Sequence, residues 1–216
     1  MNAPTTPIIY IVDDVVDDDP ALRSSLQCLL ESVGLEARAF TDIDTFLTVY
    51  QPDRPACLLL DVRVSGRGDP SPQQQLREHG IDVPVIIITG CGNVATAVAA
   101  MKQGALDFIE KPFNDQLLLD CIHNALAEDV VRRRARARRR ELMRRFDTLT
   151  PREQDVLRWV VKGLSNRQIA KLLNLSRKTV EVHRAKVMQK TRADTLSRLI
   201  RMAMAIGILN IYDAED

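Results

Sequence analysis

The sequence predicts an α/β domain, built on a doubly wound five-stranded parallel sheet, followed by a small all-α domain with a helix-turn-helix. Three observations support this expectation. Strand-like and helix-like stretches alternate five times up to residue 128, as they do when helices connect parallel strands. Residues 147–216 contain short helical stretches separated by turn signals. The charge changes sign between these parts: residues 1–128 carry 19 acidic and 8 basic residues, and the remainder carries 10 acidic and 22 basic ones, which favours a polyanionic partner for the second part.

Five runs in the first part are expected to be strands, at residues 8–12, 35–39, 57–62, 83–89 and 106–109. The third and fourth runs are almost entirely apolar, which is typical of parallel strands covered by helices on both faces. In a doubly wound sheet a ligand binds at the C-terminal ends of the strands. We therefore expect the functional residues of this part at those ends.

Capping and terminating residues mark the helices between these strands. Pro20 is expected to open the first helix, because proline is tolerated in the first turn. We expect Thr41 to cap the second helix, and Pro70 and Pro72 to delay the start of the third. The remaining signals are Gly34, Gly80 and Gly104 at helix ends, and Asn114 as the cap of the fifth helix.

An arginine-rich stretch joins the two parts. Residues 130–145 contain nine arginines and neither glycine nor proline. We expect this stretch to continue the fifth helix as a linker whose charges face solvent. The predicted organisation is a first domain at residues 1–128, a helical linker at 129–146 and a second domain at 147–216.

The second domain is predicted to contain four short helices. Thr150, Pro151 and Glu153 form the pattern of a capping box with proline at the first helical position. Ser165 and Gln168 repeat the capping pattern. The other expected signals are Gly163 and Gly207 at helix ends, Asn174 in a left-handed turn, Ser176 as a cap and Asp194 at the start of the last helix. Two short helices joined by a tight turn near residues 174–176 indicate a helix-turn-helix.

Oxygen-bearing side chains and one lysine fall at the predicted strand ends. Asp61 follows an apolar run, and Thr89 and Lys111 end the fourth and fifth strands. The end of the first strand is crowded with carboxylates, namely Asp13, Asp14, Asp17, Asp18 and Asp19. Carboxylates are ligands that Mg²⁺ prefers. A carboxylate beside such a metal can attack a phosphoryl group while the lysine neutralises charge on the phosphoryl oxygens.

Four motifs in residues 7–128 resemble the receiver domain of two-component response regulators: VDDDPALR (16–23), CLLLDVR (57–63), VPVIIITG (83–90) and DFIEKPF (107–113). The resemblance implies a flavodoxin-like fold in which Asp61 accepts phosphate from a histidine kinase. It further implies that Lys111 contacts the phosphoryl group, that Thr89 is the switch hydroxyl and that Phe108 is the switch aromatic. The backbone carbonyl of Arg63 would complete the Mg²⁺ shell, and the Lys111–Pro112 bond would be cis.

Two departures from the receiver pattern leave alternatives open. Val-Asp-Asp occurs twice, at 12–14 and at 16–18. We favour Asp13 and Asp14 as metal ligands, because choosing Asp17 and Asp18 would place the first pair in a buried strand, at a cost of several kcal/mol. Asp17 and Asp18 nevertheless lie at the family's spacing from the helix. The loop at 64–72 also replaces the family's Met-Pro, which predicts a looser loop beside the phosphoacceptor.

Residues 149–190 resemble the LuxR-type helix-turn-helix of NarL/FixJ-type regulators, and the resemblance extends over 147–209. Val180, His183 and Val187 share one face of the third helix, which we expect to face the core. The opposite face would enter the major groove of DNA, where glutamate accepts from cytosine and small apolar side chains contact the thymine methyl. The predicted base and phosphate contacts are Asn166, Arg167, Lys178, Thr179, Glu181, Val182, Arg184, Ala185, Lys186 and Gln189.

These features together predict a cytoplasmic response regulator. It would be phosphorylated by a sensor histidine kinase with Mg²⁺ as cofactor, form a homodimer when phosphorylated, bind promoter DNA and act on RNA polymerase. No membrane partner is expected, since no run approaches 18 apolar residues. No enzymatic activity is expected either, because the C-terminal helix-turn-helix favours a regulator over an enzyme. Two alternatives remain: a phosphorylation-independent DNA-binding regulator with a degenerate receiver, and a Mg²⁺-dependent aspartyl-phosphate phosphatase, which would not need a helix-turn-helix.

Overall fold

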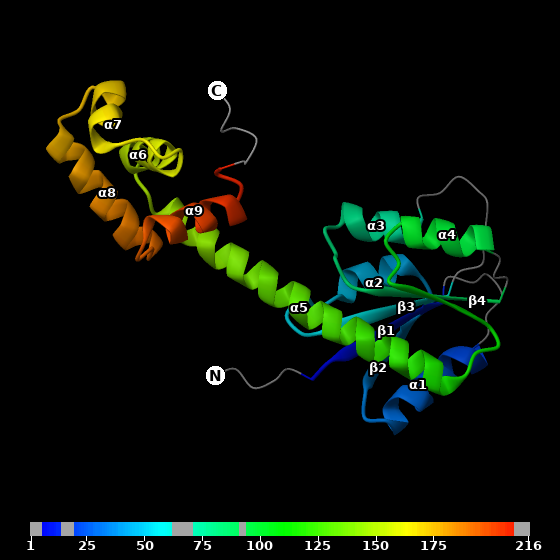
Figure 1. The fold of residues 1–216 in the computed structure, drawn as a ribbon. Helices are drawn as coiled ribbons and strands as arrows, with labels where there is room; N and C mark the ends of the chain where they lie inside the picture. The colour runs from blue at the N-terminus through cyan, green and yellow to red at the C-terminus, as the bar shows by residue number, and fades with distance from the viewer. Residues whose placement is uncertain (1–5, 14–19, 62–70, 91–93, 210–216) are drawn as a thin grey trace. The chain divides into compact units, whose positions relative to one another are not determined.

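The computed structural model describes residues 6–13, 20–61, 71–90 and 94–209 (Figure 1). The predicted metal ligands Asp14, Asp17, Asp18 and Arg63 lie outside these ranges, as does most of the loop at 64–72. The chain divides into two compact units, Met1–Arg133 and Arg134–Asp216. Each unit is described by itself.

The first unit contains a five-stranded, entirely parallel sheet in the order β2-β1-β3-β4-β5. The strands are β1 (Ile8–Asp13), β2 (Glu36–Phe40), β3 (Ala56–Asp61), β4 (Val85–Thr89) and β5 (Asp107–Glu110). This strand order is that of the flavodoxin-like doubly wound fold, so the predicted fold class is confirmed. All residues of β1, β3 and β4 are buried, as expected for strands covered on both faces.

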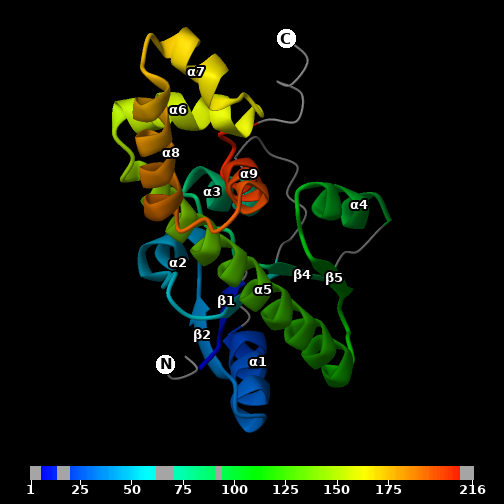
Figure 2. The ribbon, with the colours of Figure 1, turned by 60° about the vertical axis from the view of Figure 1, so that its left-hand side comes forward.

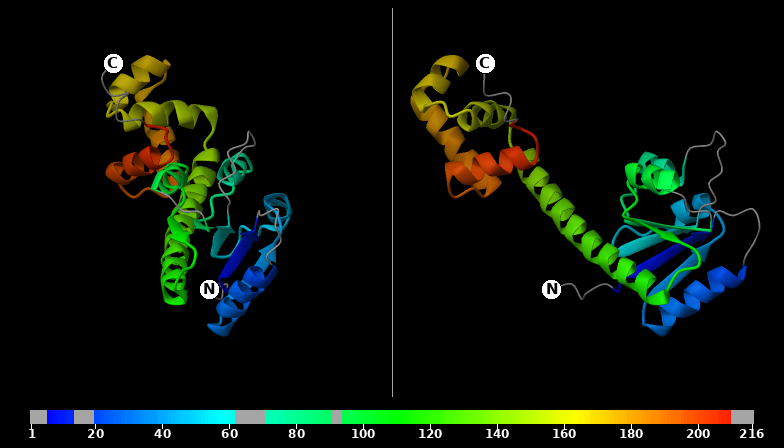
Figure 3. Two further views of the ribbon diagram at one scale, coloured as in Figure 1. Left: turned by 90° about the vertical axis from the view of Figure 1, so that its right-hand side faces the viewer. Right: turned by 45° about the vertical axis from the view of Figure 1, so that its right-hand side comes forward.

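Helices cover both faces of this sheet (Figures 1 and 3). They are α1 (Pro20–Ser32), α2 (Ile43–Val49), α3 (Pro72–Glu78), α4 (Val94–Lys102) and α5 (Asp115–Asp147). Leu30 of α1 and Ile122 of α5 pack against one face with Ile9 and Ile11 of β1. The alternate β1 side chains join α2, α3 and α4 in a second core on the other face, because successive strand residues point to opposite sides.

In the first unit, most helix boundaries agree with the sequence prediction, with one correction at α2. Pro72 is the first residue of α3 and Ser71 is its N-cap, and Asn114 accepts a hydrogen bond from the Gln116 N–H at 2.7 Å. The expectation that Thr41 caps α2 is wrong. Asp42 is the N-cap and accepts from the Thr45 N–H at 2.7 Å, while the Thr41 hydroxyl donates to the other Asp42 oxygen at 3.0 Å. A carboxylate has two oxygens and can accept both bonds.

Helix α5 continues without a break through the arginine-rich stretch, and the division between the two units falls within it, after Arg133. The first arginines of the stretch, however, do not simply face solvent. Asp129 is completely buried and accepts a hydrogen bond from the Ala56 N–H at 2.9 Å. The Arg133 guanidinium forms an ion pair with Asp129 and donates to the Pro52 carbonyl at 2.5 Å and to the Tyr50 hydroxyl at 3.3 Å. The Asp129–Arg133 pair therefore fixes this part of α5 to the first unit.

In the part of the second unit that the structure describes, four short helices follow the end of α5 (Figure 2). They are α6 (Pro151–Val161), α7 (Asn166–Leu173), α8 (Arg177–Thr191) and α9 (Leu196–Ala205). Both predicted capping boxes are present, and Asn174 has a left-handed conformation with φ of 50°. The expectation that Asp194 starts the last helix needs correction: Thr195 is the N-cap, and Asp194 instead forms an ion pair with Arg198 at 3.1 Å.

A buried glutamate connects α6 to α8 in this unit. Glu153 accepts from the Thr150 N–H at 2.9 Å and from the Lys190 ammonium at 2.6 Å. Burial alone would raise the pKa of the Glu153 carboxyl, but the hydrogen bonds from Lys190 and Thr150 outweigh burial and hold this pKa below its usual value. The apolar core around this pair includes Val156 and Leu199, both fully buried. No helix within the described residues is long and apolar enough to span a bilayer.

Candidate functional site

Two carboxylates lie side by side at the C-terminal edge of the sheet. Asp13 is the last residue of β1 and Asp61 is the last residue of β3, and the two are register partners. Both are buried, with 2% and 7% of their surface exposed. Paired strands lie about 4.8 Å apart, so these two carboxylates share one site. Asp13 and Asp61 thus occupy the place where a doubly wound sheet binds its ligand.

Lys111 reaches this edge from the end of β5. Its ammonium forms an ion pair with an Asp61 carboxylate oxygen, and its backbone N–H donates to the Thr89 carbonyl at 2.8 Å. The bond between Lys111 and Pro112 is cis, as the family resemblance implied. Thr89 ends β4 and is buried. Parallel pairing therefore brings together a lysine and an aspartate that are fifty residues apart in sequence.

An arginine that the sequence reasoning did not select belongs to this site. Arg23 of α1 places a guanidinium nitrogen 3.6 Å from an Asp13 oxygen. The signal in the sequence was its position in the first turn of a helix that directly follows an acidic cluster. Arg23 adds a second cation to the edge that already contains Lys111, and so offsets the charge of the two buried carboxylates.

The residues at this edge have the donor chemistry that Mg²⁺ requires. Mg²⁺ is usually bound through one or two carboxylates together with phosphate oxygens and water, and Asp13 and Asp61 supply two carboxylates. Within the described ranges no three acidic, histidine or cysteine side chains gather in one place. The other predicted donors, Asp14 or the Asp17–Asp18 pair and the Arg63 carbonyl, lie outside those ranges.

Strand β5, which ends at this edge, carries a partly exposed aromatic, and the helix packed beside it has an exposed apolar face. Phe108 is in β5, opposite Ile87 of β4, and packs partly against the second core. On the neighbouring helix α4, Val94, Val98 and Met101 are all exposed, with 81% of the Val94 surface accessible. Their spacing places them on one face of α4. Large apolar side chains grouped on a surface indicate an interaction site.

In the second unit, α7 and α8 form the helix-turn-helix around the Asn174 turn (Figure 2). Val180 and Val187 are fully buried, which confirms that this face of α8 packs on the core. His183 lies on the same side but is partly exposed, so it is at the margin of the core and not inside it. The opposite face of α8 is exposed at Lys178, Glu181, Val182, Ala185, Lys186 and Gln189.

Several of the predicted contact residues already bind one another. The Arg184 guanidinium donates to the Asn166 side-chain oxygen at 3.0 Å and so connects α8 to α7. Glu181 forms an ion pair with Arg177 at 3.3 Å, one helical turn before it. Thr179 is partly buried and its hydroxyl lies 2.8 Å from that of Ser176. Arg167 and Lys186 are exposed, and their ammonium or guanidinium groups are available to phosphates.

Comparison with known proteins assigns a family to each unit. The model of the response regulator receiver domain matches residues 14–123, and the model of bacterial regulatory proteins of the luxR family matches residues 147–203. Nodulation protein W of Bradyrhizobium diazoefficiens is 44% identical over 207 residues, which cover 96% of this chain and 89% of that protein. Transcriptional regulatory protein FixJ of the same species is 39% identical over 196 residues, covering 91% of this chain and 96% of FixJ.

Solved structures give the same result. The response regulator StyR superposes with a TM-score of 0.74 at 38% identity, covering 93% of this chain and 99% of StyR. Full-length FixJ from B. japonicum gives a TM-score of 0.53 at 38% identity, covering 94% of this chain and 98% of FixJ. These matches extend over both units and confirm the resemblance indicated by the sequence motifs. The chain belongs to the response regulators of the NarL/FixJ type, in which a receiver domain precedes a LuxR-type DNA-binding domain that controls transcription.

Proposed function

We propose that Asp61 accepts a phosphoryl group from a sensor histidine kinase and that this phosphorylation controls binding to promoter DNA. The observation that carries the proposal is the position of Asp61. It is a buried carboxylate at the C-terminal edge of the sheet, in register with Asp13 and in an ion pair with Lys111. A nucleophilic carboxylate needs nearby cations, because both it and the phosphoryl oxygens are negatively charged.

The side chains at this edge have separable roles in the transfer. An Asp61 oxygen attacks the phosphorus atom, and the bond from phosphorus to the kinase histidine breaks. The Lys111 ammonium moves from the carboxylate to a phosphoryl oxygen and neutralises its charge. Asp13 would hold Mg²⁺ together with Asp14, and the bound ion supplies further charge neutralisation at the phosphoryl oxygens. The Thr89 hydroxyl donates a hydrogen bond to the phosphoryl group, and Phe108 follows it as the switch aromatic.

The output of this switch is recognition of duplex DNA by α8. Its exposed face enters the major groove, where Glu181 accepts from a cytosine amino group and Val182 and Ala185 contact a thymine methyl group. The cationic side chains around this face, together with Asn166 and Thr179, contact phosphates and fix the orientation of the helix. Because Arg184 and Asn166 are hydrogen-bonded to each other, they approach the backbone as one unit.

Phosphorylation would act through a second copy of the chain. The exposed apolar face of α4 at Val94, Val98 and Met101 adjoins the strand that carries Phe108 and supplies apolar area for a dimer contact. A dimer places two copies of α8 on two DNA half-sites. The phosphoryl group then shifts the population toward the dimer that binds DNA more tightly.

The experiment that tests this function is phosphorylation by a small-molecule donor. With acetyl phosphate and Mg²⁺ the full chain should acquire a phosphoryl group, and Asp61→Asn should abolish this labelling. Asp53→Asn is the matched control, because Asp53 is an exposed aspartate in the loop before β3, at the opposite end of that strand from Asp61. Equal labelling of the Asp61→Asn variant would contradict the assignment, and absence of labelling in the unaltered chain would favour a phosphorylation-independent regulator.

A further inference from the structure

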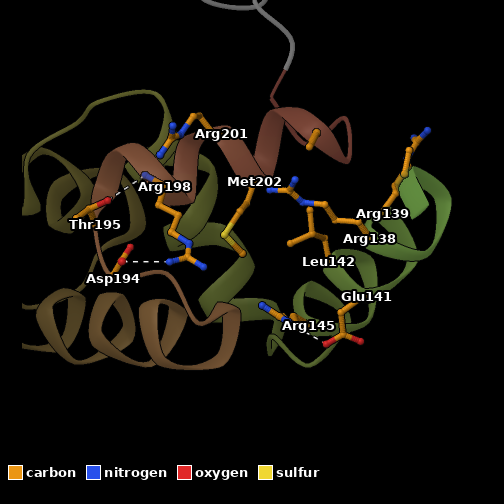
Figure 4. Close-up of a pocket in the computed structure, with 12 residues that line it drawn as sticks. Arg138, Arg139, Glu141, Leu142, Arg145, Asp194, Thr195, Arg198, Arg201 and Met202 are labelled. Atoms are coloured by element: carbon orange, nitrogen blue, oxygen red, sulfur yellow. Dashed lines mark hydrogen bonds and ion pairs between the residues drawn. The ribbon is translucent and has the colours of Figure 1, made fainter. Parts of the chain in front are cut away.

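A groove that the proposed function does not use lies in the second unit, between the C-terminal part of α5 and helix α9 (Figure 4). Its volume is about 920 Å³. Leu142 of α5 and Met202 of α9 form its apolar centre, and Ala135 and Ala205 add small apolar side chains. A groove of this size between two helices accommodates several residues of an extended or helical segment.

Positive charge surrounds this apolar centre. Five arginines line the groove, and the only carboxylates of its lining within the described residues are Glu141 and Asp194, which gives a net charge of +3. Both carboxylates are already engaged, Glu141 with Arg145 at 3.0 Å and Asp194 with Arg198 at 3.1 Å. The other three arginines, which have no ion pair with any residue that the structure describes, are Arg138, Arg139 and Arg201.

The positive charge and the apolar centre together determine which kind of ligand fits the groove. A DNA backbone offers phosphates but no apolar side chain to cover Leu142 and Met202. The same groove of a second copy would bring +3 against +3, which is repulsive. An acidic peptide segment with apolar side chains fits both features of the groove.

The chain itself contains such a segment at residues 210–216. This segment, NIYDAED, has three acidic residues and no basic residue, so its charge of −3 is opposite to that of the groove. Ile211 and Tyr212 supply apolar side chains next to the acidic ones. Residue 210 follows Ala205, which lines the groove, by only five residues. The residues between them form the turn that ends α9, in which the Ile208 N–H donates to the Ala203 carbonyl at 2.9 Å, so the segment begins close to the C-terminal end of α9.

We propose that residues 210–216 bind in the groove between α5 and α9. The apolar side chains of the segment cover Leu142 and Met202, and its carboxylates form ion pairs with Arg138, Arg139 and Arg201. Each exposed ion pair is weak by itself, but the short connection gives the segment an effective concentration in the millimolar range. The bound segment neutralises arginines that would otherwise attract polyanions without regard to sequence.

The experiment measures competition between the segment and a peptide copy of it. The chain shortened after Leu209 is titrated into a fluorescein-labelled peptide with the sequence of residues 208–216, and fluorescence anisotropy reports binding. We expect saturable binding that weakens as salt is added. The full chain should bind the peptide at least about tenfold more weakly, because its own segment already occupies the groove. The full-length triple variant Asp213→Asn, Glu215→Gln, Asp216→Asn should bind the peptide as the shortened chain does.

Matched arginine variants distinguish binding in the groove from attraction of the peptide by positive charge in general. In the shortened chain, the pair Arg138→Ala and Arg201→Ala should weaken peptide binding about tenfold, as expected for the loss of two charged partners. The pair Arg134→Ala and Arg140→Ala removes the same charge from exposed positions of α5 outside the groove lining. It should change binding less than about twofold.

Three outcomes would overturn the proposal. If both pairs of arginine substitutions weakened peptide binding equally, the peptide would be attracted by positive charge in general and not bound in the groove. Equal peptide binding by the full and the shortened chains would show that residues 210–216 do not occupy the groove. A dimer of the full chain that sedimentation detects, and that Arg201→Ala dissolves, would place the segment in the groove of a second copy.

Discussion

Replacing Asp129 by alanine should destabilise the first unit and leave the second unit unchanged. Asp129 is fully buried, and its side chain accepts from the Ala56 N–H and pairs with Arg133. The substitution leaves a buried N–H without its acceptor and a guanidinium without its counter-ion. Breaking a buried ion pair in this way costs about 3–5 kcal/mol. Arg133 keeps its bonds to Pro52 and Tyr50, so we expect the lower end, about 3 kcal/mol.

Urea unfolding can follow the two units separately. The chain has a single tryptophan, Trp159, which is in α6 of the second unit, whereas circular dichroism reports both units. With a slope of about 2 kcal/mol per molar urea, Asp129→Ala should lower the midpoint of the first unit by about 1.5 M. The tryptophan transition should not move. Asp129→Asn keeps an acceptor for the N–H and should cost about half as much.

Two controls make this prediction refutable. Glu128→Ala removes an ion pair with Arg132 that is exposed to solvent, and it should cost less than about 1 kcal/mol. The double variant Asp129→Ala, Arg133→Ala should recover part of the loss, because no unpaired charge then remains. The reasoning would be refuted if Asp129→Ala shifted the urea midpoint of the first unit by less than about 0.3 M, well under the change expected from the slope. An equal shift of the tryptophan transition would also refute it.

Three further predictions concern the second unit and the metal site. Because hydrogen bonds hold the folded-state pKa of Glu153 below its unfolded value, they stabilise the second unit above about pH 4.3, and this contribution is lost as the pH falls through the folded-state pKa. Glu153→Gln should remove that pH dependence and cost about 1–3 kcal/mol at pH 7, measured by tryptophan fluorescence. Lys186→Ala should weaken binding to all DNA sequences and reduce the salt dependence, whereas Glu181→Ala should relax the preference at one base pair by about 1–3 kcal/mol, as a binding-site selection would show. Asp13→Ala should weaken Mg²⁺ binding, measured by titration calorimetry, far more than Asp17→Ala; the opposite ranking would move the metal site to the second acidic pair.

The functional edge of the sheet could be predicted because the hydrophobic pattern and the order of the strands along the chain are enough to place the strand ends. Parallel strands must end at one edge, so Asp61, Thr89 and Lys111 could be assigned to one site despite their separation in sequence. Arg23 was missed because its contact with Asp13 depends on how α1 packs on the sheet. The cap of α2 was misplaced by one residue because Thr41 and Asp42 are both good capping residues, and only the geometry of the turn chooses between them.

The arginine-rich stretch shows a different limit of prediction from sequence. Nothing in the local pattern distinguishes Arg133, which binds the first unit, from Arg138, which lines the groove. The distinction comes from Asp129 and Pro52, whose positions depend on the assembled sheet. The family resemblance implied dimerisation on the fourth helix and fifth strand, but the exposed residues of α4 could not be identified from the sequence, since an apolar stripe on a helix normally indicates the core side.

The most direct test of the proposed phosphorylation switch is promoter-DNA binding with and without acetyl phosphate and Mg²⁺, compared between the unaltered chain and Asp61→Asn. Genome-wide footprinting first identifies a bound site, and fluorescence anisotropy on that duplex then measures the affinity. The phosphodonor should tighten binding by the unaltered chain and leave binding by Asp61→Asn unchanged. Equal affinity of the unaltered chain with and without the donor, or an equal response of the Asp61→Asn variant, would contradict control of DNA binding through Asp61.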